Sequence, residues 1–158
     1  MTVNKYLSLA LWVVVFEAVS FAIGIMTQGD VDGWYAALAR PPFTPPNLVF
    51  PVMWTILYAL IAAAGWMLWR NRAREDGEFL LVLFAIYMVL NWSWTGIFFA
   101  AHLLLPGLLW IMLMNAVAIM LIVLSWREAR TAALLLIPPT LWTSYAAYLN
   151  GGFWWLNT

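Results

Sequence analysis

The sequence has little charge and no cysteine. Charged residues make up 9% of its 158 residues, against about 25% in an average soluble domain, while hydrophobic residues make up 66%. A soluble protein of this composition would lack the polar side chains needed to cover its surface, so we expect an integral membrane protein. The absence of cysteine excludes disulfides, thiolate metal sites and cysteine nucleophiles.

Residues that carry out acid–base or metal chemistry are also scarce. His102 is the only histidine, and it falls in a short connection where a solvent-facing role is expected. No histidine pair has the spacing of a metal site, and there is no glycine-rich phosphate loop or nucleophile–base set. Seven basic and seven acidic residues are scattered along the chain, which argues against nucleic-acid binding. The sequence therefore does not predict a conventional enzyme.

Long apolar segments account for most of the chain. A membrane-spanning helix needs about 20 mostly apolar residues, whereas strands of a membrane barrel would alternate in polarity. Runs such as 103–109 and 132–137 do not alternate. We expect an all-α, polytopic protein in which residues 1–158 form one transmembrane domain of five helices. The predicted spans are 6–26, 51–69, 79–101, 106–126 and 131–149.

The basic residues predict an orientation. Six of the seven would lie on the side of the N-terminus and of the connections after spans two and four: Lys5, Arg70, Arg72, Arg74, Arg127 and Arg130. The other side would hold only Arg40. Basic residues are enriched on the cytoplasmic side, so we expect a cytoplasmic N-terminus, most readily in a bacterial cell membrane.

The first connection, residues 27–50, is far longer than the others. Long loops in compact proteins are usually functional or disordered. Residues 31–39 could form a separate short helix, with Asp30 or Asp32 as its N-cap. Four prolines within residues 41–46 should then stiffen the backbone into a lid over one mouth of the bundle. The alternative is that Trp34, Tyr35 and Phe43 are ordinary interfacial aromatics.

Helical spacing places several polar and aromatic side chains on shared faces. Trp54 and Tyr58 are four residues apart, and Asn91, Trp94 and Phe98 follow a similar spacing in span three. Asn91 is expected to face the bundle interior, as an anchor for a ligand or as a contact between helices.

Two further features of the spans have open interpretations. Glu17 lies in mid-span and is either functional or paired with a residue such as Ser20. Pro138 and Pro139 are expected to interrupt span five, one turn before Trp142, or simply to bend it. An aromatic interior with few polar groups suits a flat, apolar, aromatic ligand.

These residues resemble one known family. The motif Trp34-Tyr35-x-x-Leu38-x-Arg-Pro41-x-Phe43-x-Pro45-Pro46, followed by Phe50-Pro-x-x-Trp54-x-x-Leu-Tyr58, is similar to the signature of the tryptophan-rich sensory protein/translocator protein family, TspO. Asn91-x-x-Trp94-x-x-x-Phe98-Phe99 and Pro138-x-x-Leu-Trp142-x-x-Tyr-Ala146 resemble the same family. The resemblance covers essentially the whole chain, in order and at the family's spacing.

The resemblance implies a five-helix bundle, usually dimeric, that binds porphyrins such as protoporphyrin IX and haem and takes part in sensing and stress responses. It implies a pocket closed by the first loop, with no obligatory cofactor. The ligand-binding residues expected from the motifs and the helical spacing are Trp34, Tyr35, Trp54, Tyr58, Asn91, Trp94, Trp142 and Ala146. The expected lid residues are Pro41, Phe43, Pro45 and Pro46.

Two departures and two alternative functions accompany the resemblance. Pro42 stands where many members have a second aromatic, and no basic residue follows Tyr145 or Tyr148, so sterol recognition through the animal members' pattern is doubtful.

Small residues in span two, such as Ala59 and Ala63, could permit close packing between helices of one chain or of two. The alternative functions are light- and oxygen-dependent porphyrin degradation and transport of porphyrin- or sterol-like ligands.

Overall fold

The computed structural model describes residues 4–158, and all regular structure in this range is helical. Five helices are long and apolar enough to cross a membrane, which confirms the predicted fold class. Two of them continue into short π-helical segments, η1 and η2. The elements are α1 (Lys5–Asp30), η1 (Val31–Tyr35), α2 (Val49–Arg70), α3 (Gly77–Thr95), η2 (Gly96–Ala100), α4 (Leu104–Glu128) and α5 (Arg130–Asn157).

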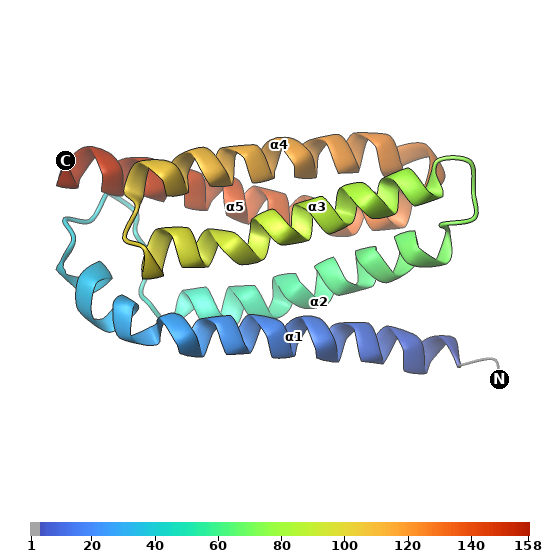
Figure 1. The fold of residues 1–158 in the computed structure, drawn as a ribbon, viewed down its shortest axis with the longest axis horizontal. Coiled ribbons are helices and arrows are strands. Elements are labelled where there is room, and N and C mark those ends of the chain that lie inside the picture. Colours follow the sequence, from blue (N-terminus) through green and yellow to red (C-terminus); the bar gives the residue numbers. More distant parts are fainter. Residues whose placement is uncertain (1–3) are drawn as a thin grey trace.

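The helices form a closed bundle in which α1 is the least embedded member (Figure 1). Contacts run from α1 to α2, from α2 to α5, from α5 to α4 and from α4 to α3, and only sparse contacts join α3 and η2 back to α1. Only Phe16 and Thr27 of α1 are buried, so most of this helix faces outward. Because five spans are an odd number, the start of α1 and the end of α5 lie at opposite ends of the bundle (Figure 1).

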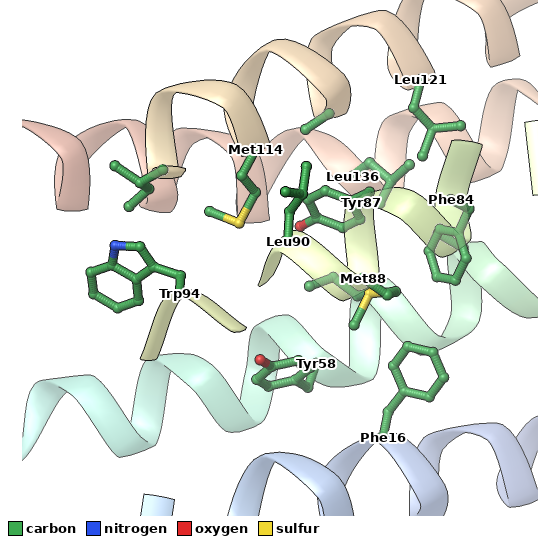
Figure 2. Packing of buried hydrophobic residues seen from close by; sticks show 14 of the residues in the cluster. Phe16, Tyr58, Phe84, Tyr87, Met88, Leu90, Trp94, Met114, Leu121 and Leu136 are labelled. Atoms are coloured by element: carbon green, nitrogen blue, oxygen red, sulfur yellow. The ribbon is translucent and has the colours of Figure 1, made fainter. Parts of the chain in front are cut away.

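Aromatic and aliphatic side chains from all five helices fill the core. Tyr87 on α3 is fully buried, and α3 contributes more of the labelled side chains in Figure 2 than any other helix. The labelled residues are Phe16, Tyr58, Phe84, Tyr87, Met88, Leu90, Trp94, Met114, Leu121 and Leu136 (Figure 2).

The small residues of span two are used largely inside the chain. Ala62 and Ala64 are fully buried, and a Cβ atom added at Gly65 would lie 2.4 Å from Cζ of Phe84. Gly65 therefore allows α2 and α3 to approach closely around the Phe84 ring.

The predicted break after span one was wrong. Residues 31–37 continue α1 through η1 without an interruption, so Asp30 and Asp32 cap no separate helix. No proline occurs in this stretch, and isolated glycines lower helix propensity without ending a helix. The helical path ends just before Arg40, where the proline-rich segment begins.

The predicted interruption of span five was also wrong. Helix α5 continues through Pro138 and Pro139 and extends to Asn157, eight residues beyond the expected end at 149. The hydroxyl of Thr140 donates to the carbonyl of Leu136, and that of Thr143 donates to the carbonyl of Pro139, at 2.8 and 3.1 Å. These local bonds support the backbone beside the prolines.

The loop between η1 and α2 is fixed to the last turns of α5. The Asn157 amide donates to the Ala39 carbonyl at 3.0 Å and accepts from the Ala39 N–H at 2.9 Å. The Tyr148 hydroxyl donates to the Pro42 carbonyl at 3.1 Å, and that of Tyr145 donates to the Phe43 carbonyl. We refer to the end of the bundle that carries this loop as the loop end.

A close approach of Gly152 to Pro41 makes the loop's position testable. A Cβ atom at residue 152 would lie 2.5 Å from Cβ of Pro41, a rigid ring, whereas one at Gly151 would lie 3.8 Å from the Leu108 methyls. We expect Gly152→Ala to displace the loop, to increase its cleavage by proteinase K several-fold and to destabilise the protein by about 1–3 kcal/mol. Gly151→Ala is the matched control, and equal cleavage of both variants would contradict the packing described.

Candidate functional site

A cavity of about 950 Å³ lies between α1 and the other helices, toward the loop end. Its wall is built from α1, η1, the end of the first loop, α2, the end of α3 with η2, and α5, while α4 contributes no lining residue. Lining residues Phe21, Ile25 and Leu48 are more than 60% exposed, so the cavity reaches the surface of the bundle. The sparse contact between α1 and α3 leaves the space for it.

Aromatic side chains form much of the cavity wall. Trp54 and Tyr58 project from one face of α2 with their ring centroids 5.3 Å apart. Across the cavity, Trp142 of α5 meets Phe50 edge-on at 6.0 Å, and the small Ala146 follows one turn later. Flat faces separated by a small residue can accept a planar ligand by stacking.

The two π-helical segments meet at the loop end of the cavity. Tyr35 of η1 is 4% exposed and packs edge-on against Phe99 of η2 at 5.4 Å. Trp34 and Phe98, from the same two segments, pack at 5.7 Å behind them. Single-turn π-helices are frequent at functional sites, because the extra residue in the turn changes the direction of the following side chains.

Hydrogen bonds to neighbouring helices hold two of the aromatic lining residues. The Tyr58 hydroxyl donates to Oδ1 of Asn91 at 2.6 Å, and Asn91 is 3% exposed. The Trp94 indole N–H donates to the Gly107 carbonyl on α4 at 3.2 Å. These bonds connect helices and fix the rings before any ligand binds.

Two polar atoms of the lining residues have no partner. Nε1 of Trp142 and Oε1 of Glu17 are buried and form no hydrogen bond with the described residues. A buried polar atom without a partner costs roughly 1–3 kcal/mol, and more when it is charged. The two atoms supply one donor and one acceptor.

The structure brings six of the eight predicted ligand-binding residues together around the cavity. They are Tyr35, Trp54, Tyr58, Trp94, Trp142 and Ala146. The other two lie outside the lining: Asn91 binds Tyr58 from behind, and Trp34 stacks on His102 at 4.3 Å. The His102 ring also lies 3.0 Å from Asp30, so it joins the end of α3–η2 to α1.

The predicted lid residues are not part of the cavity wall. Pro41, Phe43, Pro45 and Pro46 do not line the cavity. Pro41 is buried against Gly152 of α5, while Phe43 is 85% exposed. Residues 27–50 line the cavity at their two ends instead. The first part belongs to α1 and η1 and includes Asp32 and Tyr35, and the last part contributes Asn47, Leu48 and Phe50.

The other lining residues were missing from the predicted site, and four of them matter for its chemistry: Glu17, Ser20, Phe50 and Phe99. A mid-span carboxylate is the strongest sequence signal among them, and Ser20 shares its face at a spacing of three residues. Phe99 could not be placed by ideal helical spacing, because η2 changes the phase of the helix after Thr95.

The lining residues also limit the chemistry available. No group of three or more His, Cys, Asp or Glu side chains that could hold a metal ion occurs in residues 4–158. The cavity lining includes no histidine, cysteine or methionine. The arrangement can bind by stacking, by apolar contact and by a small number of hydrogen bonds.

Comparison with known proteins agrees with this architecture. The model of the TspO/MBR family matches residues 12–156. The chain is 34% identical over 148 residues to the "Tryptophan-rich protein TspO" of Chlorobaculum tepidum, covering 93% of this chain and 94% of that protein. It is also 34% identical over 140 residues to a protein of the same name from Archaeoglobus fulgidus, covering 89% and 90%. Identity to the "Translocator protein" of Ovis aries is 30% over 130 residues, covering 80% of this chain and 76% of that protein.

Proposed function

This chain belongs to the TspO/MBR family, and we propose that it is a membrane receptor that binds a porphyrin, such as protoporphyrin IX, and acts in tetrapyrrole sensing. The observation that carries the proposal is the aromatic wall of the cavity, with Trp54, Trp94 and Trp142 among its residues. A volume of about 950 Å³ falls at the upper end of the usual range for small-molecule sites.

The shape and chemistry of the cavity suit a large planar molecule. Aromatic rings from the first half of α2, the end of α3 and the middle of α5 offer stacking surfaces, and Ala146 leaves room between them. The rings of Tyr58 and Trp94 are already fixed by hydrogen bonds, so a ligand would lose little affinity to ordering them.

The lining supports a metal-free porphyrin more strongly than haem. The iron of haem is usually held by histidine, cysteine or methionine, and none of these lines the cavity. The tyrosines Tyr35 and Tyr58 are the remaining candidates for an axial ligand, and the Tyr58 hydroxyl is already bound to Asn91.

Porphyrin binding should depend on the cavity tryptophans. With the purified protein in detergent, we expect protoporphyrin IX to quench tryptophan fluorescence and to shift its Soret band. Trp54→Phe and Trp142→Phe should each weaken binding by about 1–2 kcal/mol through lost stacking area. Trp155→Phe is the matched control, since Trp155 is 77% exposed and lies outside the cavity. Wild-type protein that gives no spectral change at micromolar porphyrin would refute the proposal.

We propose that the protein lies in a bacterial cell membrane with its N-terminus in the cytoplasm. Because the chain has no cysteine, single cysteines can report the topology. In intact cells, a membrane-impermeant maleimide should label Thr158→Cys at the loop end and should label Ala73→Cys, in the connection after α2, only after permeabilisation. The reverse pattern of labelling would invert the proposed orientation.

We also propose that two copies associate, as the family resemblance implies. Ala62, Ala64 and Gly65 pack within one chain, whereas Ala59 and Ala63 are half-buried and leave part of α2 available to an interface. Light scattering of the detergent complex should give the protein mass of two chains, and a mass of one chain would contradict association.

A further inference from the structure

The cavity carries acidic side chains at both of its ends and no basic side chain. Among its lining residues only Glu17 and Asp32 have a carboxyl group, and no lysine, arginine or histidine is present. Asp32 lies near the loop, is exposed, and accepts a hydrogen bond from Nε2 of Gln28 at 2.9 Å. Glu17 differs from Asp32, because its Oε1 atom is buried and has no partner among the described residues.

Glu17 is half-buried and lies at the end of the cavity farthest from the loop. It precedes the end of α1 at Asp30 by 13 residues, or roughly 20 Å along the helix axis. Ser20 lies one turn away on the same face, and Tyr58 is the deepest lining residue of α2. We call the region of Glu17, Ser20 and Tyr58 the inner end of the cavity.

A carboxyl group in this position strongly favours some ligand groups over others. Hydrocarbon supplies no hydrogen-bond donor, so a carboxylate inside a membrane protein is stabilised by a cation or a donor brought to it. A second carboxylate placed beside it is disfavoured, since two such groups at one site cannot both remain ionised. An N–H or ammonium group would instead form a charge-assisted hydrogen bond.

We infer that Glu17 is a ligand-binding residue that selects for a hydrogen-bond donor or a cation at the inner end of the cavity and excludes a ligand carboxylate from it. The inference rests on the proposed function in taking this cavity as the ligand site. It names the chemical class of the preferred ligand, a flat aromatic molecule that is neutral or carries an amine at one edge.

The position of Glu17 also determines the orientation of a bound porphyrin dicarboxylate. Trp142 lies in the half nearer the loop, because it contacts Phe50 at the start of α2. Its indole N–H is buried and has no partner among the described residues, so it can donate to a ligand carboxylate after a rotation of the ring toward the cavity. Asp32 at the loop end is exposed and already accepts a hydrogen bond from Gln28, so it opposes a carboxylate less than Glu17 does. The two propionates therefore point toward the loop end, and the edge without carboxylates points toward Glu17.

Three porphyrins with the same ring and different charges at the propionate positions test the selection. The first is protoporphyrin IX, the second is its dimethyl ester, and the third carries both propionates as amides with a terminal primary amine. Compared with wild type, Glu17→Gln should weaken binding of the amine by about tenfold or more and should tighten binding of the diacid by about threefold or more. Affinity for the ester should change by less than about twofold, because it carries no charge.

The matched control removes the same charge from the opposite end of the cavity. Asp32→Asn should change the ratio of amine to diacid affinity by far less than Glu17→Gln does. Equal effects of the two variants, or an unchanged ratio in Glu17→Gln, would overturn the inference. Glu17→Leu, an apolar side chain of similar size, provides a second variant if the amide version does not fold, and it should lose the preference for the amine.

A second pair of probes separates this inference from the proposed function. A tricyclic aromatic amine and the corresponding tricyclic carboxylic acid are flat but are not porphyrins. If no porphyrin binds and the amine still binds more weakly to Glu17→Gln than to wild type, the porphyrin proposal fails and the role of Glu17 stands. If porphyrins bind, but neither the three porphyrins nor the two tricyclic probes distinguish Glu17→Gln from wild type, the role of Glu17 fails and the porphyrin proposal stands.

Discussion

The structure depends on the lack of hydrogen-bond partners in a hydrocarbon environment. Helices satisfy their own backbone groups, so five of them can cross the bilayer with apolar side chains facing outward. Polar side chains within the spans are not satisfied by the helix itself, so each needs a hydrogen-bond partner from another part of the protein or from a ligand. Tyr58 finds Asn91, and Trp94 finds the Gly107 carbonyl, whereas Glu17 and Trp142 keep unpartnered atoms beside the cavity. Five other buried side-chain atoms, on residues that do not line this cavity, also lack a partner, so it is their place in the cavity wall that singles out Glu17 and Trp142.

The twelve tryptophans divide into different roles according to where their indole N–H groups point. Trp66 donates to the Ser8 hydroxyl at 3.0 Å and ties α2 to α1, and Trp110 donates to the Leu90 carbonyl at 3.1 Å and ties α4 to α3. These rings are structural. Nε1 of Trp142 and Nε1 of Trp92 have no partner among the described residues, and of these two rings only Trp142 lines the cavity. Residue type alone therefore does not distinguish a packing tryptophan from a binding one.

The sequence predicts the bundle well because hydrophobic length and helical spacing are local properties. The five spans, the shared face of Trp54 and Tyr58 and the interior position of Asn91 follow from them. What the sequence could not predict depends on long-range or irregular geometry. The π-helical segments rotate Tyr35 and Phe99 relative to ideal helices, and the path of the first loop is set by Asn157, more than 100 residues away. Glu17 is recognisable in the sequence as a mid-span acid. That it lines a cavity could not be predicted, because the cavity depends on where α2 and α5 lie relative to α1.

Helix α1 buries few of its side chains, and this determines both how it is attached to the bundle and where the cavity forms. A helix with only two buried residues contributes little to the core, so its inward face is available to form one wall of a cavity. It packs against α2 and is further tied to the bundle by Trp66 at Ser8, by aromatic packing of Phe16 on Phe84 at 6.1 Å, and by the contact of His102 with Asp30. Between these points its inward face meets the cavity instead of another helix, and that is the face that carries Glu17. A carboxylate on a tightly packed helix such as α3 would have to be paired within the protein, whereas on α1 it can remain directed at whatever occupies the cavity.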